Sequence, residues 1–171
     1  MLLILTGVST SWKTTLQKEL MTRWWKSAIN FTTRKPRSEK ERDEYVFIDK
    51  PTFMKKLINW DFIEHTDYNG EYYGASRFLP EGNVVMVLDP VGRAQVMSEY
   101  ARKDLSLNTV YLSIDKEVQL ARLENRHMSV RDIEARHKDY QWFDKTKFCL
   151  EIDWEMEVGR AADIVEANMK T

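Results

Sequence analysis

Residues 2–15 read LLILTGVSTSWKTT, and this stretch decides the fold. Its first part, Leu2–Thr6, is an apolar run with the length of a buried strand, and a segment with helical spacing follows the turn. The turn fits the pattern G-x-x-x-x-G-K-[ST] at Gly7, Lys13 and Thr14, between a strand and a helix as the pattern requires. Such a turn holds phosphate oxygens with backbone N–H groups and the helix N-terminus.

Trp12 is the misfit in this loop, because the pattern has glycine at its position. Glycine lets the loop approach phosphate closely and tolerates backbone angles that other residues adopt only with strain. The stretch therefore also fits an ordinary strand–turn–helix start with a serine or threonine cap. If it is a phosphate loop, Lys13 would neutralise charge near the β and γ phosphates, and Thr14 would offer a hydroxyl to Mg²⁺.

The rest of the chain alternates between short apolar runs and segments with helical spacing. The runs with the length of buried strands are Ala28–Thr33, Val84–Leu88, Thr109–Ile114 and Phe148–Ile152. The segments with helical spacing are Lys13–Trp25, with Leu16, Leu20 and Trp24 on one face, Val91–Lys103, Glu117–Arg126, Val130–Phe143 and Met156–Met169. This alternation predicts a parallel sheet covered by helices, so the expected fold class is α/β.

Residues 34–82 interrupt the alternation with a charge-dense stretch followed by short elements of another kind. A strand is expected at Tyr45–Ile48, then a helix from Asp49, as N-cap, to Ile58. Phe62–Tyr73 reads as a hairpin, because Asn69-Gly70 is a strong turn signal between two apolar runs. We expect a small α+β subdomain inserted into the α/β core.

Four ordered motifs in and beside this insertion resemble those of the guanylate kinase family. They are TTRKPR at residues 32–37, YVF at 45–47, FIE at 62–64 and GEYYG at 70–74. With the phosphate loop, the resemblance runs from Leu2 to about Phe143. It implies a three-layer P-loop kinase core and one guanylate-kinase-like domain over residues 1–171. The core would be residues 1–33 and 83–171, the monophosphate-binding insertion 34–82, and a short helical lid about 126–137.

The resemblance also implies roles for individual residues. Two arginines three positions apart, Arg34 and Arg37, would clamp the phosphate of the monophosphate, with hydroxyls from Tyr45 and Tyr73. The carboxylate of Glu64 would accept hydrogen bonds from the guanine N1–H and amino group. The full set matched to GMP is Asn30, Arg34, Arg37, Tyr45, Glu64, Tyr73, Gly74, Ala75 and Asp89.

The remaining assignments concern ATP and the transferred phosphoryl group. The residues expected at ATP and its phosphates are Gly7, Ser9, Ser11, Trp12, Lys13, Thr14, Thr15 and Arg122, with Thr14 as the candidate Mg²⁺ ligand. The expected catalytic residues are Lys13, Arg34, Arg126 and Arg136. Each role has a plainer alternative, since Asp89 also suits the N-cap of a helix at Pro90 and surface arginines commonly pair with nearby glutamates.

Several positions depart from the family pattern. Thr10, like Trp12, stands in place of a loop glycine, and Val87 stands where an Mg²⁺-linked aspartate is usual. Asn30 and Ala75 stand where hydroxyl residues usually contact guanine and phosphate. These departures put the Mg–ATP half of the site more in doubt than the monophosphate half.

Composition narrows the class of partner. The 171 residues are 43% hydrophobic and 31% charged, with net charge −1, which is typical of a soluble globular protein without general affinity for nucleic acid or anionic membrane. No apolar run reaches the length of a membrane span. We therefore expect a cytoplasmic monomer or homodimer whose partners are small nucleotides, and expect Cys149, the single cysteine, to be a buried apolar residue.

The leading functional hypothesis is a nucleoside monophosphate kinase that uses Mg–ATP to convert GMP or dGMP to the diphosphate. A non-catalytic binding module of guanylate-kinase type is the second hypothesis, favoured by Trp12 and Val87. A kinase for another nucleotide or a sugar phosphate is the third, favoured by Asn30 and Ala75.

Overall fold

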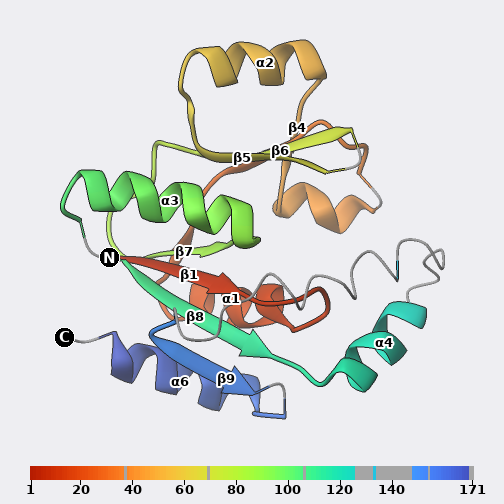
Figure 1. The fold of residues 1–171 in the computed structure, drawn as a ribbon, viewed down its shortest axis with the longest axis vertical. Coiled ribbons are helices and arrows are strands. Elements are labelled where there is room, and N and C mark those ends of the chain that lie inside the picture. Colours follow the sequence, from red (N-terminus) through yellow and green to blue (C-terminus); the bar gives the residue numbers. More distant parts are fainter. Residues whose placement is uncertain are drawn as a thin grey trace.

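The structure is a computed structural model that describes residues 1–171 except 37, 69, 106, 126–132, 134–147, 154 and 170–171 (Figure 1). The strands are β1 (Leu2–Thr6), β2 (Lys26–Ser27), β3 (Asn30–Thr32), β4 (Val46–Phe47), β5 (Phe62–Tyr68), β6 (Glu71–Ser76), β7 (Val84–Val87), β8 (Asn108–Ser113) and β9 (Leu150–Asp153). The helices are α1 (Lys13–Thr22), α2 (Lys50–Ile58), α3 (Pro90–Arg102), α4 (Lys116–Glu124) and α6 (Val158–Asn168), with a 3₁₀ helix, η1 (Glu39–Asp43).

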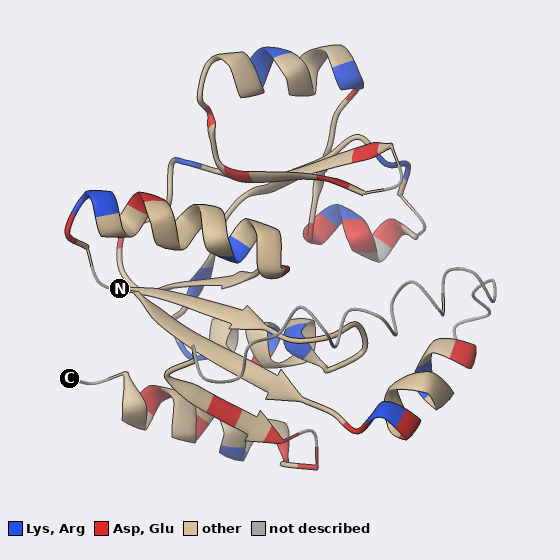
Figure 2. Cartoon of the chain, in the orientation of Figure 1, with Lys and Arg blue, Asp and Glu red and all other residues tan. Residues whose placement is uncertain are grey.

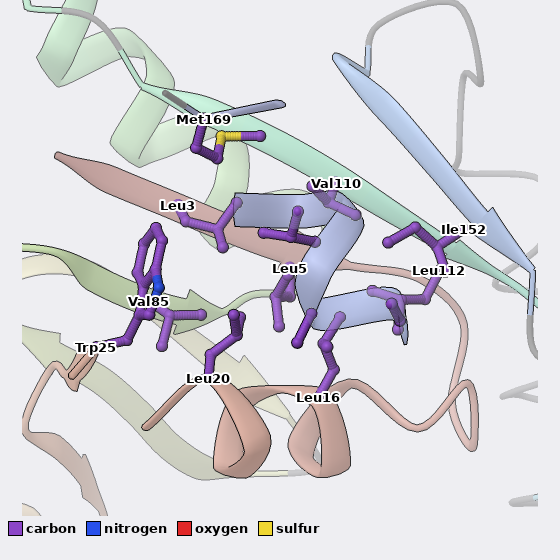
Figure 3. Packing of buried hydrophobic residues seen from close by; sticks show 13 residues of the cluster. Leu3, Leu5, Leu16, Leu20, Trp25, Val85, Val110, Leu112, Ile152 and Met169 are labelled. Atoms are coloured by element: carbon purple, nitrogen blue, oxygen red, sulfur yellow. The ribbon is translucent and has the colours of Figure 1, made fainter. Parts of the chain in front are cut away.

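The larger sheet has the strand order β2-β7-β1-β8-β9, and all of its neighbouring strands pair in parallel. Alternate residues of β1 serve the two faces: Leu3 and Leu5 belong to one apolar cluster, Leu2 and Ile4 to another. The first cluster includes residues of α1 and α6, and Figure 3 shows Leu16 and Leu20 of α1 pointing toward Leu5. The second includes Val96 of α3. The expected three-layer α/β architecture is confirmed.

The smaller sheet has the order β4-β3-β6-β5 and lies beneath α2 in Figure 1. The predicted hairpin is present, since Tyr68 pairs with Glu71 across a turn in which Gly70 has a φ of 74°. Helix α2 covers one face of the sheet: the ring of Phe53 stacks on Phe62 at 4.5 Å and on Tyr72 at 5.4 Å between centroids. On the other face, Ala75 of β6 is fully buried in the second apolar cluster.

Side chains of α3 and β6 connect the two sheets. The guanidinium of Arg77, just after β6, donates to the carbonyl oxygens of Trp60 and Phe62, each at 2.8 Å, and pairs with Glu99 of α3. The amide of Gln95 on α3 bonds both backbone groups of His65, at 3.0 and 2.8 Å. These contacts hold β5 against α3.

Three sequence expectations need correction. The run expected as a strand of the parallel sheet, Ala28–Thr33, contains only β3 of the smaller sheet, and the larger sheet takes the two preceding residues as β2, because an apolar run does not indicate which sheet it joins. Helix α1 ends at Thr22, so Trp24 takes a left-handed conformation and is 93% exposed instead of facing the core. Cys149 is exposed rather than buried.

Among the residues that the structure describes, no helix is both long and apolar enough to cross a membrane.

Candidate active site

Three neighbouring strands bring predicted nucleotide-binding segments to one edge of the larger sheet. The phosphate loop follows β1, Asp89 follows β7, and α4 follows β8, all at the carboxyl ends of parallel strands. The hydroxyl of Thr6 donates to the carbonyl of Leu88 at 2.9 Å and joins the ends of β1 and β7. Ligands of open parallel sheets bind at this edge.

The loop backbone has the shape that the missing glycines would favour. Thr10 has a φ of 70° and Trp12 a φ of 49°, so both departures from the glycine pattern adopt left-handed conformations. A left-handed residue with a side chain is strained by about 1–2 kcal/mol. Gly7 is required by packing, because a Cβ there would lie 2.5 Å from the carbonyl oxygen of Leu112. The loop therefore keeps its course with strain at two positions.

Helix α1 begins without a side-chain cap, and the described residues give no partner to two buried donors beside it. Trp12 is the N-cap of α1 but makes no side-chain cap, whereas Asp49, Asp89 and Glu157 cap α2, α3 and α6. The Trp12 indole packs against the core cluster, where its buried Nε1 has no hydrogen-bond partner among the described residues. The buried hydroxyl of Thr10 likewise has no partner in the described part of the chain. The backbone N–H groups of an uncapped helix start suit a polyanion.

Basic and amide side chains surround the loop. The ammonium of Lys13 donates to the carbonyl of Val8 at 2.6 Å and to the hydroxyl of Ser11 at 3.2 Å. From α4, Arg122 donates to the carbonyl of Thr10 at 3.0 Å, which places its guanidinium beside the loop. Gln119 of the same helix donates to the carbonyl of Ser9 at 3.3 Å. Sequence reasoning missed Gln119, although it lies three positions before Arg122.

The loop residues fit the phosphates of ATP better than they fit a metal. Thr14 and Thr15 are exposed in the first turn of α1, and the Thr14 hydroxyl is the group that would reach Mg²⁺. Val87, at the usual aspartate position, packs against the apolar core cluster and offers no ligand. Among the described residues no group of three acidic, histidine or cysteine side chains could hold a metal. Mg²⁺ commonly binds through substrate phosphates and water with few protein ligands, so Thr14 alone is compatible.

The second half of the site is centred on Arg34. Its guanidinium forms a two-pronged ion pair with Glu41 of η1, at 3.0 and 3.2 Å, and lies 5.9 Å from the Tyr45 ring centroid. The rings of Tyr45 and Tyr73 are 6.3 Å apart. The structure thus brings together three predicted phosphate ligands, Arg34, Tyr45 and Tyr73, and pairs the arginine with the Glu41 carboxylate. Figure 2 shows the acidic residues of η1 beside this region.

Burial and pairing set the ionisation of this cluster. Desolvation lowers the pKa of Arg34, but hydrogen bonds to Glu41 and Tyr73 outweigh it and leave the pKa raised. Desolvation also raises the pKa of the Tyr45 hydroxyl, so it remains a hydrogen-bond donor at neutral pH. Among the residues that the structure describes, none is a hydrogen-bond partner of the buried Arg34 Nε. Glu41 was missed from the sequence, where it is one of several charges in a dense run.

The base-binding candidates lie on the face of the smaller sheet opposite α2. A register shift between Phe62 and Glu64 turns Phe62 toward Phe53 of α2 and Glu64 to the other face. Glu64 then pairs with Ala75 on β6, and Ala75 pairs with Asn30 on β3. β-Bulges often redirect side chains next to active sites in this way.

Two carboxylates meet beside this face. Glu64 is 7% exposed, and its Oε2 lies so near α3 that a Cβ at Gly92 would be 2.6 Å away. Asp89 accepts from the Gly92 N–H at 2.7 Å, so its expected role as helix N-cap is confirmed. Burial and the Asp89 charge raise the pKa of Glu64 to about 8, against a hydrogen bond from the Ala75 backbone.

Other predicted residues lie elsewhere. Gly74 is on the α2 face, where a Cβ would lie 3.2 Å from the Phe53 ring, so it makes room for packing. Arg37, Arg126 and Arg136 lie outside the described residues.

Comparisons with known proteins agree with this geometry. The family model described as guanylate kinase matches residues 1–154. A guanylate kinase of Methylobacillus flagellatus is 32% identical over 144 residues, covering 79% of this chain and 70% of that protein. One of Ruegeria sp. is 31% identical over 154 residues, covering 83% of this chain and 69% of that protein.

A solved structure supports the fold. The crystal structure of guanylate kinase from Anaplasma phagocytophilum has a TM-score of 0.68 at 20% identity, over 99% of this chain and 84% of that one. A gluconokinase from Sinorhizobium meliloti has a TM-score of 0.55 at 12% identity, over 98% of this chain and 90% of that one. With the family match over most of its length, the chain belongs to the guanylate kinase family of nucleoside monophosphate kinases.

Proposed function

We propose that this protein transfers the γ-phosphoryl group of ATP to GMP or dGMP, giving ADP and the nucleoside diphosphate. The observation that carries the proposal is the pair of carboxylates, Glu64 and Asp89, beside the cluster of Arg34, Tyr45 and Tyr73. Carboxylates accept hydrogen bonds from the adjacent donors of a guanine edge, and an arginine with two tyrosines suits a phosphate dianion.

The phosphate loop would hold the triphosphate. Backbone N–H groups at the start of α1, the Lys13 ammonium and the Arg122 guanidinium would supply hydrogen-bond donors and positive charge. Mg²⁺, bound through the phosphates and Thr14, would neutralise charge on the transferred group. The indole of Trp12 packs on the core, which favours a loop open to phosphate.

The monophosphate would replace Glu41 on the Arg34 guanidinium. A phosphate oxygen of the monophosphate forms the new bond to the γ-phosphorus as the bond to the ADP oxygen breaks. No side chain needs to act as a nucleophile, because positioning and charge stabilisation dominate this chemistry. Arg37, Arg126 and Arg136 are proposed to complete the charge around the transferred group.

A coupled assay of ADP formation tests the proposal, with Mg–ATP and a panel of ribo- and deoxynucleoside monophosphates at pH 8.5, where Glu64 is ionised. We expect the highest kcat/KM with GMP or dGMP, and Lys13→Met serves as the control for contaminating kinases. Equal kcat/KM for all monophosphates would contradict the guanine assignment.

The non-catalytic binding module is the second candidate, favoured by the apolar Val87 and the bulky Trp12. It predicts that GMP raises the melting temperature while no monophosphate supports ADP formation. The same protein preparation and the same panel distinguish the two.

A further inference from the structure

A row of three residues crosses the smaller sheet on the face away from α2. Glu64 on β5 pairs with Ala75 on β6, which pairs with Asn30 on β3. Cross-strand partners project to the same face, so a carboxyl, a methyl and an amide follow one another across it. Asn30 and Ala75 are the two positions at which the family pattern has hydroxyl residues. Because they are neighbours in register, the two departures change one small area of the site.

The polar groups at the two ends of this row can each change between donor and acceptor. The Asn30 side chain is half-buried, and the described residues give its amide no hydrogen bond, so the amide can present its oxygen or its NH₂ group. The Glu64 side chain is buried, with the Ala75 backbone N–H as its protein partner. An ionised carboxylate only accepts, whereas a protonated carboxyl donates once and accepts once.

The charged surroundings of Glu64 favour proton uptake. Asp89, at the start of α3, is the charged group that acts on it from that helix. Neither Ala75 nor Asn30 carries charge, and His65 of β5 pairs with Gly74 and so faces the opposite side. The resulting pKa of about 8 places both forms of Glu64 within the neutral range.

The two forms match different purines. The N1–H and 2-amino groups of guanine are adjacent donors, which suit the carboxylate. The N1 and 6-amino groups of adenine are an acceptor beside a donor, which suit the protonated carboxyl. The amide of Asn30 can donate to a 6-oxo group or accept from a 6-amino group. A buried mismatch in either arrangement leaves polar groups unpaired, which is how such sites discriminate.

On the basis of the proposed function, we propose that Glu64 and Asn30 together hydrogen-bond the purine edge. Proton uptake by Glu64 shifts the binding preference of the monophosphate site from guanine toward adenine nucleotides. GMP binding then requires loss of the Glu64 proton, and AMP binding requires that the proton stay.

The test measures the affinities of the full chain for GMP and AMP by isothermal titration calorimetry from pH 6.5 to 8.5. Because one proton separates the two binding forms, the ratio of GMP to AMP affinity should rise about tenfold per pH unit, wherever the pKa lies. Ionisation of the nucleotide phosphate is common to both ligands and cancels in the ratio. Repeating the GMP titration at pH 7 in two buffers of different ionisation enthalpy should show proton release.

Three variants sharpen the test. Glu64→Gln keeps one donor and one acceptor at every pH, so its ratio should be constant and shifted toward AMP. Asp89→Asn keeps a good N-cap and leaves Glu64 free to titrate, so its ratio should keep the same slope with pH. Asn30→Ala should weaken both nucleotides.

Failure of this inference can be distinguished from failure of the proposed function. A pH-independent ratio, or AMP that does not bind at pH 6.5, with GMP still phosphorylated, overturns this inference and leaves the proposed kinase intact. GMP that neither binds nor is phosphorylated at any pH overturns both.

Discussion

The phosphate loop and the monophosphate site are strained in different ways. In the loop the strain lies in the backbone, where Thr10 and Trp12 occupy left-handed conformations. In the monophosphate site the tension is electrostatic, because Glu64 is buried beside Asp89. Such departures from local preference concentrate at functional sites.

The two kinds of strain should be relieved by different changes. Substitution by glycine should relieve the backbone strain in the loop, and pH should not affect it. The electrostatic tension of the monophosphate site should respond to pH and to neutral isosteres. Arg34 differs from both, because its guanidinium is already paired with the Glu41 carboxylate before any phosphate binds.

The largest expected effect is the pH dependence of stability due to Glu64. Its pKa is 4.5 when unperturbed and about 8 in the folded protein, so the folded state holds the proton more tightly. This contribution to stability is full below pH 4.5 and is lost as pH rises through 8, by at most about 5 kcal/mol. Urea unfolding at pH 5.5, 7 and 8.5 should show the loss in wild type and a smaller loss in Glu64→Gln. Parallel profiles would show that Glu64 is not protonated in the folded protein.

Lys13→Met should give the next largest effect. Removing a charge aimed at the transferred phosphoryl group lowers kcat by roughly 100- to 1000-fold, about 3–4 kcal/mol. GMP affinity should not change, because Lys13 contacts Val8 and Ser11 in the other half of the site. The matched control is Lys18→Met on the same helix, whose exposed pair with Glu44 should leave kcat unaltered. Equal losses in both variants would indicate damage to α1 rather than to catalysis.

Arg34→Met should raise the KM for GMP by roughly 10- to 100-fold, as expected for loss of hydrogen bonds to a charged group worth about 1.5–3 kcal/mol. Its partner gives the contrasting variant. Glu41→Gln removes the carboxylate that competes with phosphate for the guanidinium, so the KM for GMP should fall several-fold. Steady-state kinetics at saturating Mg–ATP measure both. A rise in KM in both variants would mean that Glu41 positions Arg34 instead of competing for it.

Sequence periodicity predicted the centre of the larger sheet well because its neighbouring strands β7, β1 and β8 are buried, mainly apolar runs. It failed between residues 26 and 32, where two short strands of different sheets adjoin and only tertiary pairing separates them. At the site, motifs located Arg34, Glu64 and Asp89. They could not show Glu41 on the guanidinium or Gln119 on the loop, since both contacts join segments through space.

The smallest expected effect concerns Trp12, and a pair of variants isolates it. Trp12→Gly relieves left-handed strain of about 1 kcal/mol but loses the packing of a half-buried indole, about 1–2 kcal/mol, so the two terms nearly cancel. Trp12→Ala loses the same packing and keeps the strain. The free energy of unfolding should therefore be about 1 kcal/mol higher for the glycine variant than for the alanine variant, measured by urea unfolding. Equal stabilities would show that the loop relaxes out of the left-handed conformation.

A comparison of wild type with Trp12→Gly also tests whether the indole obstructs ATP binding. Because it packs on the core cluster, we expect wild type to be active and Trp12→Gly to keep kcat within about tenfold, with a raised KM for ATP if the indole also contacts the adenine ring. Both are measured in the ADP-formation assay with GMP at pH 8.5. A wild type that is inactive on every monophosphate, beside an active Trp12→Gly, would place the indole in the phosphate site. The strain at residue 12 would then belong to a closed loop, and the chain would be a binding module.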